Sequence, residues 1–587
     1  MCGIAGIMTC DLSPPDPARL DALAAALGHR GPDGQGRLVR GDVALLHLRL
    51  AIIDLTTGDQ PLFAPGGTAL VANGEIYNDP DLRREMAGTP FRTRSDCEPA
   101  VFLAEQEGAA YADRLRGMYA IAVHDPRTGR LLLSRDPFGI KPLYYSELPA
   151  AFGFASEPQA LLAAGFGSRA ASPARMAELL QLKFTTGAET VFPGIFRVLP
   201  GETLEIERGR IVARHRRAAL PAGRPVGIGG AAALRELERV LLDSVTAHLR
   251  SDVPYGLFLS GGIDSSALLA LMRRATGSRI QALTVGWDGG GEADESFEAE
   301  RLARIAGADC ERLTMTARDF WNLAPRIVAG IDDPTADAAV LPSWLLGRAA
   351  AAGGLKVTLC GEGADELLGG YSRYRKRRAP WRWLTRPPRT RGTFGDPPAL
   401  SGWRAGLAAA ERAVAPDRSP LQQAQAVDIA EWLPNDLLTK LDRTLMVHGV
   451  EGRTPFLDPV VADFAFRLPD AQKAGARFGK MLLRRWLAGA FPQAGAWARK
   501  KGFKPPVGAW MAARAGTLAP LVAGHPALAG LLPEPRIHAA FAEAAANAQP
   551  AWSLLFACLW HGRHILGLPA DGSVEEVLRA APRAERP

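Results

Sequence analysis

The sequence YGLFLSGGIDSSALLALM at residues 255–272 is the strongest indication of the fold of the longer part of this chain. An apolar run of strand length, Tyr255 to Leu259, enters a loop of serine and glycine at 260–262, and an apolar, helix-forming run follows. Such a loop at a helix N-terminus suits a phosphate group, because backbone N–H groups and the helix dipole face the anion. The absence of a following Gly-Lys-Ser/Thr sequence excludes a Walker P-loop.

The sequence downstream of this loop alternates runs of strand and helix length. Strands are predicted at 280–285 and 356–360, with a helix at 297–307 between them. This alternation predicts a doubly wound, mostly parallel α/β sheet that binds ligands at the carboxyl ends of its strands. From about residue 400 onward the pattern is largely helical.

The sequence upstream of the loop consists of short strand-like runs between Gly/Pro turns. These runs lie at 43–46, 69–72, 119–123 and 131–133. Residues 218–230 (AALPAGRPVGIGG) have the composition of a linker. We therefore predict a first domain at 2–212, a linker at 213–230, a second domain at 231–570 and a disordered tail at 571–587.

The N-terminus, Met1-Cys2-Gly3, suggests a nucleophile at the start of the chain. Removal of Met1 would leave Cys2 with a thiol and a free α-amino group. The thiolate is the reactive form of cysteine, and an α-amino group has a pKa of about 7.7–8.0. One residue would then supply both nucleophile and base, as in N-terminal nucleophile enzymes.

Further motifs follow in order along the chain. They are RGPD at 30–33, RLAIID at 49–54, NGEIYN at 73–78, SDCE at 95–98, RDPFG at 135–139, GEGADE at 361–366 and GRTPFLD at 452–458. With Cys2 and the Ser260 loop, they make nearly the whole chain resemble the glutamine-hydrolysing asparagine synthetase family. Ala51 stands where this family often has serine, and Pro99 follows Glu98, but neither departure removes a catalytic group.

The resemblance implies an α/β fold with two catalytic domains. Residues 2–212 would form an αββα sandwich of the N-terminal nucleophile hydrolase type, a class II glutamine amidotransferase. Residues 231–570 would form a doubly wound ATP-pyrophosphatase domain with a largely helical C-terminal part. The family also implies a homodimer.

For the first site, the resemblance assigns glutamine hydrolysis to Cys2. The tetrahedral oxyanion needs preorganised donors, which would be the Asn73 side-chain amide and the Gly74 backbone N–H. Arg49 would pair with the glutamine α-carboxylate, and Glu75 and Asp96 would hold its α-ammonium.

For the second site, the resemblance implies ATP and Mg²⁺. The ATP-binding residues would be Leu259, Ser260, Gly261, Gly262, Asp264, Ser265, Ser266, Val285, Cys360 and Gly361. Asp264 and Asp365 would be the metal ligands, since Mg²⁺ prefers carboxylate and phosphate oxygens. Glu362 would act as general base for ammonia, and Lys500 would stabilise the pentavalent phosphorus. A shift of one residue in the alignment of this motif would select Lys501 instead.

The expected reaction forms asparagine, glutamate, AMP and pyrophosphate from aspartate, glutamine, ATP and water, through β-aspartyl-AMP. Ammonia released at Cys2 would cross a buried tunnel between the domains. The alternatives are an amidotransferase for another carboxylate, such as a cell-envelope sugar acid or a secondary metabolite, a degenerate binding protein, and a β-lactam-forming relative. The last usually lacks the N-terminal cysteine, and intact Cys2, Asn73 and Asp264 argue against the degenerate protein.

Composition excludes several other classes. The 587 residues are 47% hydrophobic and 22% charged, values ordinary for a globular protein. No apolar run reaches the roughly 20 residues of a membrane span, and no signal peptide is visible. The six cysteines are scattered without a CxxC pair, which favours a reducing cytoplasm. Nine basic residues between Arg373 and Arg391 are interpreted as a surface excursion rather than a nucleic-acid site.

Overall fold

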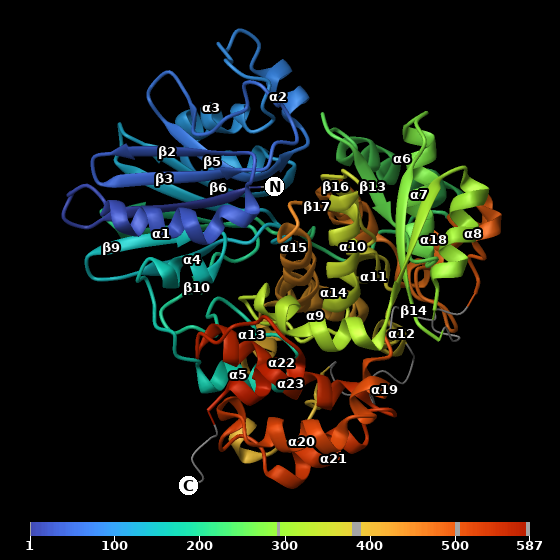
Figure 1. Cartoon of the computed structure of the whole chain (residues 1–587). Coiled ribbons are helices and arrows are strands. Elements are labelled where there is room, and N and C mark those ends of the chain that lie inside the picture. Colours follow the sequence, from blue (N-terminus) through green and yellow to red (C-terminus); the bar gives the residue numbers. More distant parts are fainter. Residues whose placement is uncertain (1, 290–293, 379–388, 499–504, 583–587) are drawn as a thin grey trace.

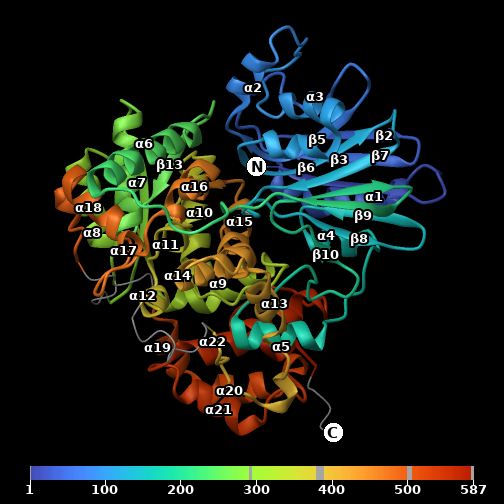
Figure 2. The same cartoon turned by 180° about the vertical axis from the view of Figure 1, so that it is seen from behind.

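The computed structural model describes residues 2–289, 294–378, 389–498 and 505–582. Figures 1 and 2 show the first part of the chain, coloured blue to cyan, beside a larger α/β part and a helical C-terminal part. No helix within the described ranges is both long and apolar enough to span a membrane.

Two antiparallel sheets make up the first part of the chain. One has the strand order β10-β8-β9-β1-β3-β2, and the other has the order β12-β11-β7-β6-β5-β4. The strands of the first sheet are β1 (Gly3–Thr9), β2 (Gly34–Arg40), β3 (Val43–Arg49), β8 (Tyr144–Glu147), β9 (Ala151–Ala155) and β10 (Phe196–Arg197). Those of the second are β4 (Leu62–Phe63), β5 (Ala69–Ile76), β6 (Gly117–Asp125), β7 (Arg130–Arg135), β11 (Glu202–Glu207) and β12 (Arg210–Arg216).

The two sheets pack face to face because alternate residues of each strand are apolar and point inward. Ile4, Leu45, Val71 and Leu133 meet in this core, and each is at most 1% exposed. Helices α1 (Pro17–Leu27) and α4 (Pro158–Ala163) cover the first sheet, and α3 (Glu98–Glu107) covers the second. The predicted αββα sandwich is therefore confirmed.

The second part is built on a five-stranded parallel sheet, as the βαβ pattern predicted. Its order is β15-β14-β13-β16-β17. The strands are β13 (Tyr255–Phe258), β14 (Gln281–Trp287), β15 (Asp309–Met315), β16 (Val357–Leu359) and β17 (Glu451–Arg453). The chain runs outward from β13 to β15 and then crosses to β16 on the other side. The carboxyl ends of β13 and β16 therefore meet at the point where the strand order reverses, which is where α/β sheets bind ligands.

Helices cover both faces of this sheet (Figure 1). Ala282 of β14 packs in the cluster of α6 (Gly230–His248), α7 (Ile263–Ala275), α8 (Ser296–Ala306) and α18 (Met481–Ala490). The next residue, Leu283, faces α10 (Val340–Ala352) and α15 (Thr439–Met446) on the other side. This alternation is that of a doubly wound sheet.

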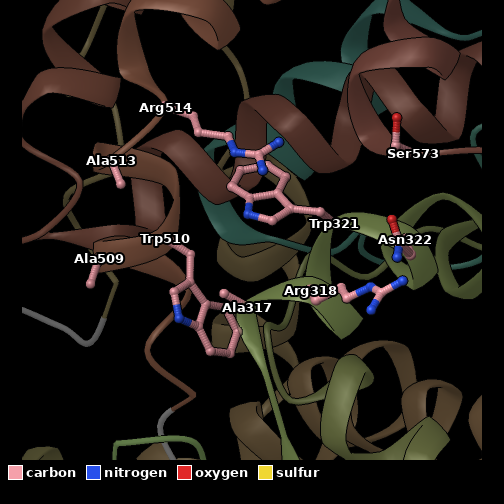
Figure 3. A pocket seen from close by; sticks show the side chains of 9 residues that line it. All are labelled: Ala317, Arg318, Trp321, Asn322, Ala509, Trp510, Ala513, Arg514 and Ser573. Carbon is pink, nitrogen blue, oxygen red and sulfur yellow. The ribbon is translucent and has the colours of Figure 1, made fainter.

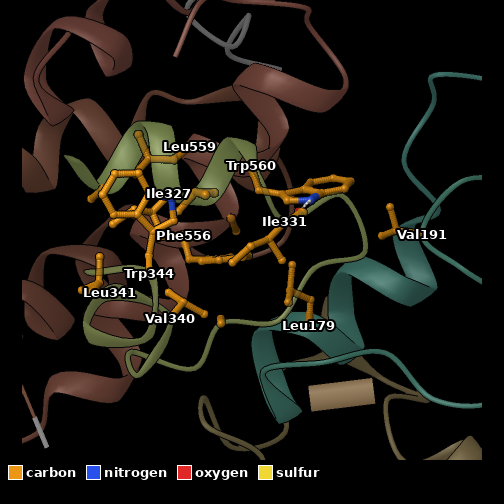
Figure 4. Packing of buried hydrophobic residues seen from close by; sticks show 14 of the residues in the cluster. Leu179, Val191, Ile327, Ile331, Val340, Leu341, Trp344, Phe556, Leu559 and Trp560 are labelled. Carbon is orange, nitrogen blue, oxygen red and sulfur yellow. Dashed lines mark hydrogen bonds between the residues drawn. The ribbon is translucent and has the colours of Figure 1, made fainter. Parts of the chain in front are cut away.

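The C-terminal part is mostly helical, as expected, and it receives one helix from the first part. Helix α5 (Pro173–Leu182) contacts α22 (Ala548–His564), and Figure 4 shows Leu179 beside the cluster of Ile331, Phe556 and Trp560. The first part is thereby anchored to the far end of the chain.

Two boundaries differ from the sequence predictions. Strand β12 continues to Arg216, four residues into the predicted linker at 213–230, because it pairs with β11. The prediction of a disordered tail at 571–587 is wrong for Val574–Ala580, which forms α23. A Ser573–Glu576 capping box starts this helix, and Val574 and Leu578 are buried. Residues 583–587 lie outside the described ranges.

Candidate active sites

Cys2 and Asn73 lie together where the two antiparallel sheets face each other. Cys2 immediately precedes β1, and its backbone N–H donates to Asn73 Oδ1 at 3.0 Å. Asn73 is fully buried, and its Nδ2 has no hydrogen-bond partner among the described residues. A buried amide donor beside a thiol is suited to a developing oxyanion. Burial raises the pKa of the Cys2 thiol, so that forming the thiolate requires a nearby base.

Gly74 follows Asn73 in β5 at a position where no side chain fits. A Cβ there would lie 2.1 Å from the Met118 carbonyl oxygen on β6. The glycine therefore allows close strand pairing at the edge of the site, with its backbone beside the Asn73 amide.

Arg49, at the end of β3, is buried but faces an exposed carboxylate. Its Nη1 donates to Asp59 Oδ1 at 2.7 Å, and its Nη2 donates to the Asp54 carbonyl at 2.5 Å. The Asp59 side chain is 80% exposed, so the pair is open to solvent on one side. Asp59 thus pairs with the guanidinium of Arg49, the group that was predicted to bind the α-carboxylate of glutamine.

The two acidic residues predicted beside this site are both buried. Asp96 Oδ2 accepts the Ile76 backbone N–H at 2.6 Å, and burial raises the pKa of Asp96 to about 6. Burial likewise raises the pKa of Glu75 well above its ordinary value, although the guanidinium of Arg453 opposes this. Both carboxyls would gain from a cationic ligand.

Arg453 comes from the parallel sheet of the second part and connects the two halves. Its Nη2 lies 3.1 Å from Glu75 Oε1, and its Nε donates to Glu451 Oε1 at 2.6 Å. Burial works against ionisation of Glu451, but Arg453 and Lys141 help to lower its pKa to about 2. Arg453 belongs to the GRTPFLD motif at 452–458, but the sequence does not identify Glu75 as its partner.

A second buried ion network lies across the same interface. Arg30 Nη1 donates to Glu157 at 2.7 Å and to Asp442 at 2.8 Å, and Arg443 Nε donates to Asp332 at 2.8 Å. Arg30 and Glu157 belong to the first part and the others to the second. Buried charges need this full pairing, which fixes the relative position of the halves.

The Ser260 loop joins β13 to α7, as predicted, at the switch point of the parallel sheet. Ser260 Oγ lies 3.2 Å from Ser265 Oγ, and the Ser260 N–H donates to Ser265 Oγ at 3.1 Å. Gly261 has φ +72°, a left-handed conformation that favours glycine. Ser266 Oγ is buried and has no partner within the described ranges. The predicted Leu259 directly follows β13 and Val285 lies on β14, and both are buried.

The two carboxylates predicted to bind metal meet at this loop, and a lysine joins them. Lys480 Nζ lies 2.5 Å from Asp264 Oδ2 and 2.8 Å from Asp365 Oδ1. A Cβ on Gly370 would lie 1.7 Å from Asp365 Oδ1, so this glycine makes room for the cluster. Sequence reasoning missed Lys480, because a single Gly-Lys pair before a helix is not distinctive. Its left-handed φ of +53° at the start of α18 is visible only in the structure.

The remaining predicted residues follow β16 or lie outside the description. The Cys360 N–H donates to the Arg453 carbonyl at 2.8 Å, and a Cβ on Gly361 would contact Asp264 Cβ at 3.2 Å. Glu362 is half-buried on this loop. Lys500 and Lys501 lie within 499–504, outside the described ranges.

A pocket of about 620 Å³ lies between α9 (Ala317–Ala329), α19 (Val507–Ala512) and the start of α23. In Figure 3 Trp321 and Trp510 line it, and Arg514 lies over the Trp321 ring at 4.6 Å. It contains none of the predicted catalytic residues, so we do not take it as the active site.

Comparison with known families agrees with both halves of this geometry. The glutamine amidotransferase domain model matches residues 1–216, and the asparagine synthase model matches residues 236–562. This chain belongs to the asparagine synthase family. Cys2 and the Ser260 loop thus lie in the two regions matched by separate family models.

Several curated members of the asparagine synthase family are similar over most of their length. A putative glutamine-hydrolysing asparagine synthetase of Mycobacterium tuberculosis H37Rv is 31% identical, over 96% of this chain and 97% of the relative. Asparagine synthetase 1 of Bacillus subtilis is 31% identical over 82% of this chain and 83% of the relative. Asparagine synthetase B of Escherichia coli is 28% identical over 83% of this chain and 78% of the relative.

Solved structures resemble the chain only in part. An allosteric regulatory enzyme of purine biosynthesis has a TM-score of 0.31 and 17% identity, over 54% of this chain and 80% of that one. The glutamine phosphoribosylpyrophosphate amidotransferase of B. subtilis has a TM-score of 0.29 and 20% identity, over 53% of this chain and 65% of that one.

Proposed function

We propose that this chain is a glutamine-hydrolysing asparagine synthetase that uses ATP and Mg²⁺. The observation that carries the proposal is the buried ion pair between Arg453 of the parallel sheet and Glu75 of the sandwich, which links the two halves that carry the sites. Family membership and the names of the relatives support the same reaction. We divide the work between a glutaminase domain at 2–212 and a synthetase domain at 231–570.

In the glutaminase domain, Cys2 attacks the glutamine side-chain amide. Asn73 Nδ2 and the Gly74 N–H stabilise the oxyanion, and ammonia leaves as the thioester forms. Water then hydrolyses the thioester and releases glutamate. Arg49 holds the α-carboxylate after it displaces Asp59, while Glu75 and Asp96 hold the α-ammonium. The raised pKa of the Cys2 thiol supports a role for the α-amino group, exposed by loss of Met1, as the base.

In the synthetase domain, the Ser260 loop holds the phosphates of ATP at the N-terminus of α7. An oxygen of the aspartate β-carboxylate attacks the α-phosphorus, and pyrophosphate leaves. Ammonia then attacks the acyl carbon, with Glu362 accepting a proton, and AMP leaves. Lys480 neutralises the charge of Asp264 and Asp365. Lys500 stabilises the pentavalent phosphorus.

Asp264 and Asp365 fit a Mg²⁺ ion, because their carboxylates already converge on one cation, Lys480. Bound Mg²⁺ would neutralise charge on the phosphates. Passage of ammonia through the interface and a homodimer are proposed from the family, and a cytoplasmic location from the scattered cysteines.

The competing proposal is an amidotransferase that uses another carboxylate as acceptor. A test is to follow asparagine and AMP together with purified enzyme, MgATP, glutamine and aspartate. Equal amounts of both products, with glutamine-dependent synthesis lost in Cys2→Ala but retained with added ammonia, support the proposal. Glutamate release without aspartate-dependent AMP would contradict it and favour another acceptor.

A further inference from the structure

A second group of charges, Lys440 and Asp337, is not accounted for by the predicted site residues. Lys440, near the start of α15, places its Nζ 3.6 Å from Asp337 Oδ2 in the loop before α10. The Lys440 side chain is 8% exposed and that of Asp337 is 23% exposed. Burial opposes the charge on Lys440, but Asp337 and Glu362 together raise its pKa. Helix α15, which carries Lys440, contacts β17, and β17 pairs with β16, the strand that precedes the loop of the proposed base.

The Asp337–Lys440 pair leaves some of its hydrogen-bonding capacity unused. A separation of 3.6 Å is longer than a hydrogen bond, so the two side chains attract each other without closing together. Asp337 Oδ1 accepts the Ala339 N–H at 3.0 Å, which orients its carboxylate. Within the described part of the chain, Lys440 Nζ has no closer polar partner. Its three donors therefore retain capacity for a ligand.

A neighbouring carboxylate, that of Asp436, is fixed by hydrogen bonds, unlike the Asp337–Lys440 pair. Asp436 accepts a hydrogen bond from Trp432 Nε1 at 2.5 Å and another from the Thr335 hydroxyl. It belongs to the π-helix at Asp428–Leu438, a rare conformation that often marks functional sites. Asp436 thus already has two hydrogen-bond donors of its own, which leaves Asp337 and Lys440 as the groups able to bind a ligand.

We propose that Asp337 and Lys440 recognise the α-ammonium and the α-carboxylate of the acceptor amino acid. This inference rests on the proposed function. Aspartate is so short that its α-groups must bind close to its reacting β-carboxylate. Glu362 follows β16, and Lys440 lies on the helix that contacts the neighbouring strand, β17. The zwitterion complements the pair: its ammonium faces Asp337, and its carboxylate faces Lys440. A sugar acid would lack the ammonium that Asp337 requires, so the pair selects an α-amino acid.

Two analogues and two variants separate the two contacts. Succinate is aspartate without the α-ammonium, and β-alanine is aspartate without the α-carboxylate. With ammonia as nitrogen donor, Asp337→Asn should raise the KM for aspartate about 10- to 100-fold but leave inhibition by succinate unchanged. Lys440→Met should raise this KM similarly but leave the inhibition constant of β-alanine unchanged. Lys440→Arg should restore part of the loss.

The glutaminase rate of each variant reports whether it is folded, and Glu575→Gln is a matched control. Glu575 pairs with Arg514 at 3.1 Å on the far helices, so its loss should leave the KM for aspartate unchanged. If a variant fails to fold, the wild-type enzyme still decides: aspartate should bind at least about tenfold more tightly than either analogue.

Two results would overturn the inference alone. One is a KM for aspartate within about twofold of wild type in both variants, and the other is equal binding of aspartate and both analogues. A wild-type enzyme that hydrolyses glutamine but forms no asparagine would overturn the proposed function as well.

Discussion

Arg453 Nη2 of the parallel sheet lies 3.1 Å from Glu75 Oε1 of the antiparallel sandwich, so an ion pair between the halves includes a proposed glutamine ligand. Both side chains are buried, and Arg453 is held further by Glu451 and by the carbonyls of His248 and Arg250. A change in the position of either half would therefore alter the charge around bound glutamine.

Arg453→Met should destabilise the protein by about 3–5 kcal/mol, because it leaves Glu75 and Glu451 buried without their partner. The measurement is the thermal unfolding temperature. The double variant with Glu75→Gln should recover part of the loss, since one of the two unpaired charges is gone. Equal unfolding temperatures for Arg453→Met and wild type would contradict the pairing seen here.

Asn73→Ala should lower the glutaminase kcat about 10²- to 10³-fold, with a smaller effect on the KM for glutamine, because the amide acts mainly on the oxyanion. Initial rates of glutamate release measure both constants. Ammonia-dependent synthesis, which does not use Cys2, is the control and should be unchanged. A loss confined to KM would assign Asn73 to binding instead.

Asp59→Ala should lower the KM for glutamine about twofold to fivefold. The exposed Asp59 carboxylate pairs with Arg49, and an exposed ion pair contributes roughly 0.2–1 kcal/mol that a substrate carboxylate must overcome. Asp21→Ala removes another exposed partner of an arginine, Arg37, and should leave KM unchanged. An increase in KM for Asp59→Ala would show that Asp59 helps to bind glutamine.

The kcat/KM for glutamine should decline once as the Cys2 α-amino group is protonated and again, more steeply, below about pH 6, the pKa to which burial raises Asp96. The sign follows from the charge: the ionised carboxylate binds the α-ammonium, and protonation as the pH falls removes this attraction. In the bound complex the ammonium should lower the pKa of Asp96. The decline in kcat should therefore begin at a lower pH than that in kcat/KM. Coincident profiles would argue against Asp96 as the ammonium ligand.

Lys480→Met should reduce aspartate-dependent AMP formation at least about tenfold to hundredfold while glutaminase activity persists. Its ammonium neutralises Asp264 and Asp365, and without it the two carboxylates would repel the phosphates of ATP. Lys480→Arg, which keeps the charge, should retain more activity than Lys480→Met. Normal AMP formation in Lys480→Met would limit the lysine to a structural role.

The fold class could be predicted from local patterns, because strand-length alternation and the strand–loop–helix at 255–272 are properties of neighbouring residues. The tail shows the limit of such reasoning. The sequence near the C-terminus suggested disorder, yet Val574 and Leu578 are buried in the C-terminal helical part. Composition alone cannot reveal the packing partners that stabilise so short a helix.

By itself the sequence determined the two-part α/β architecture and the residue types at each site, since Cys2, Asn73 and the Ser260 loop belong to contiguous motifs. Which distant charges meet depends on the folded arrangement and is visible only there. Lys480 joins Asp264 across 216 positions, Arg453 reaches Glu75 from another sheet, and Lys440 faces Asp337. The physical reason is that a buried charge must find a partner, and which partner it finds depends on how sheets and helices pack.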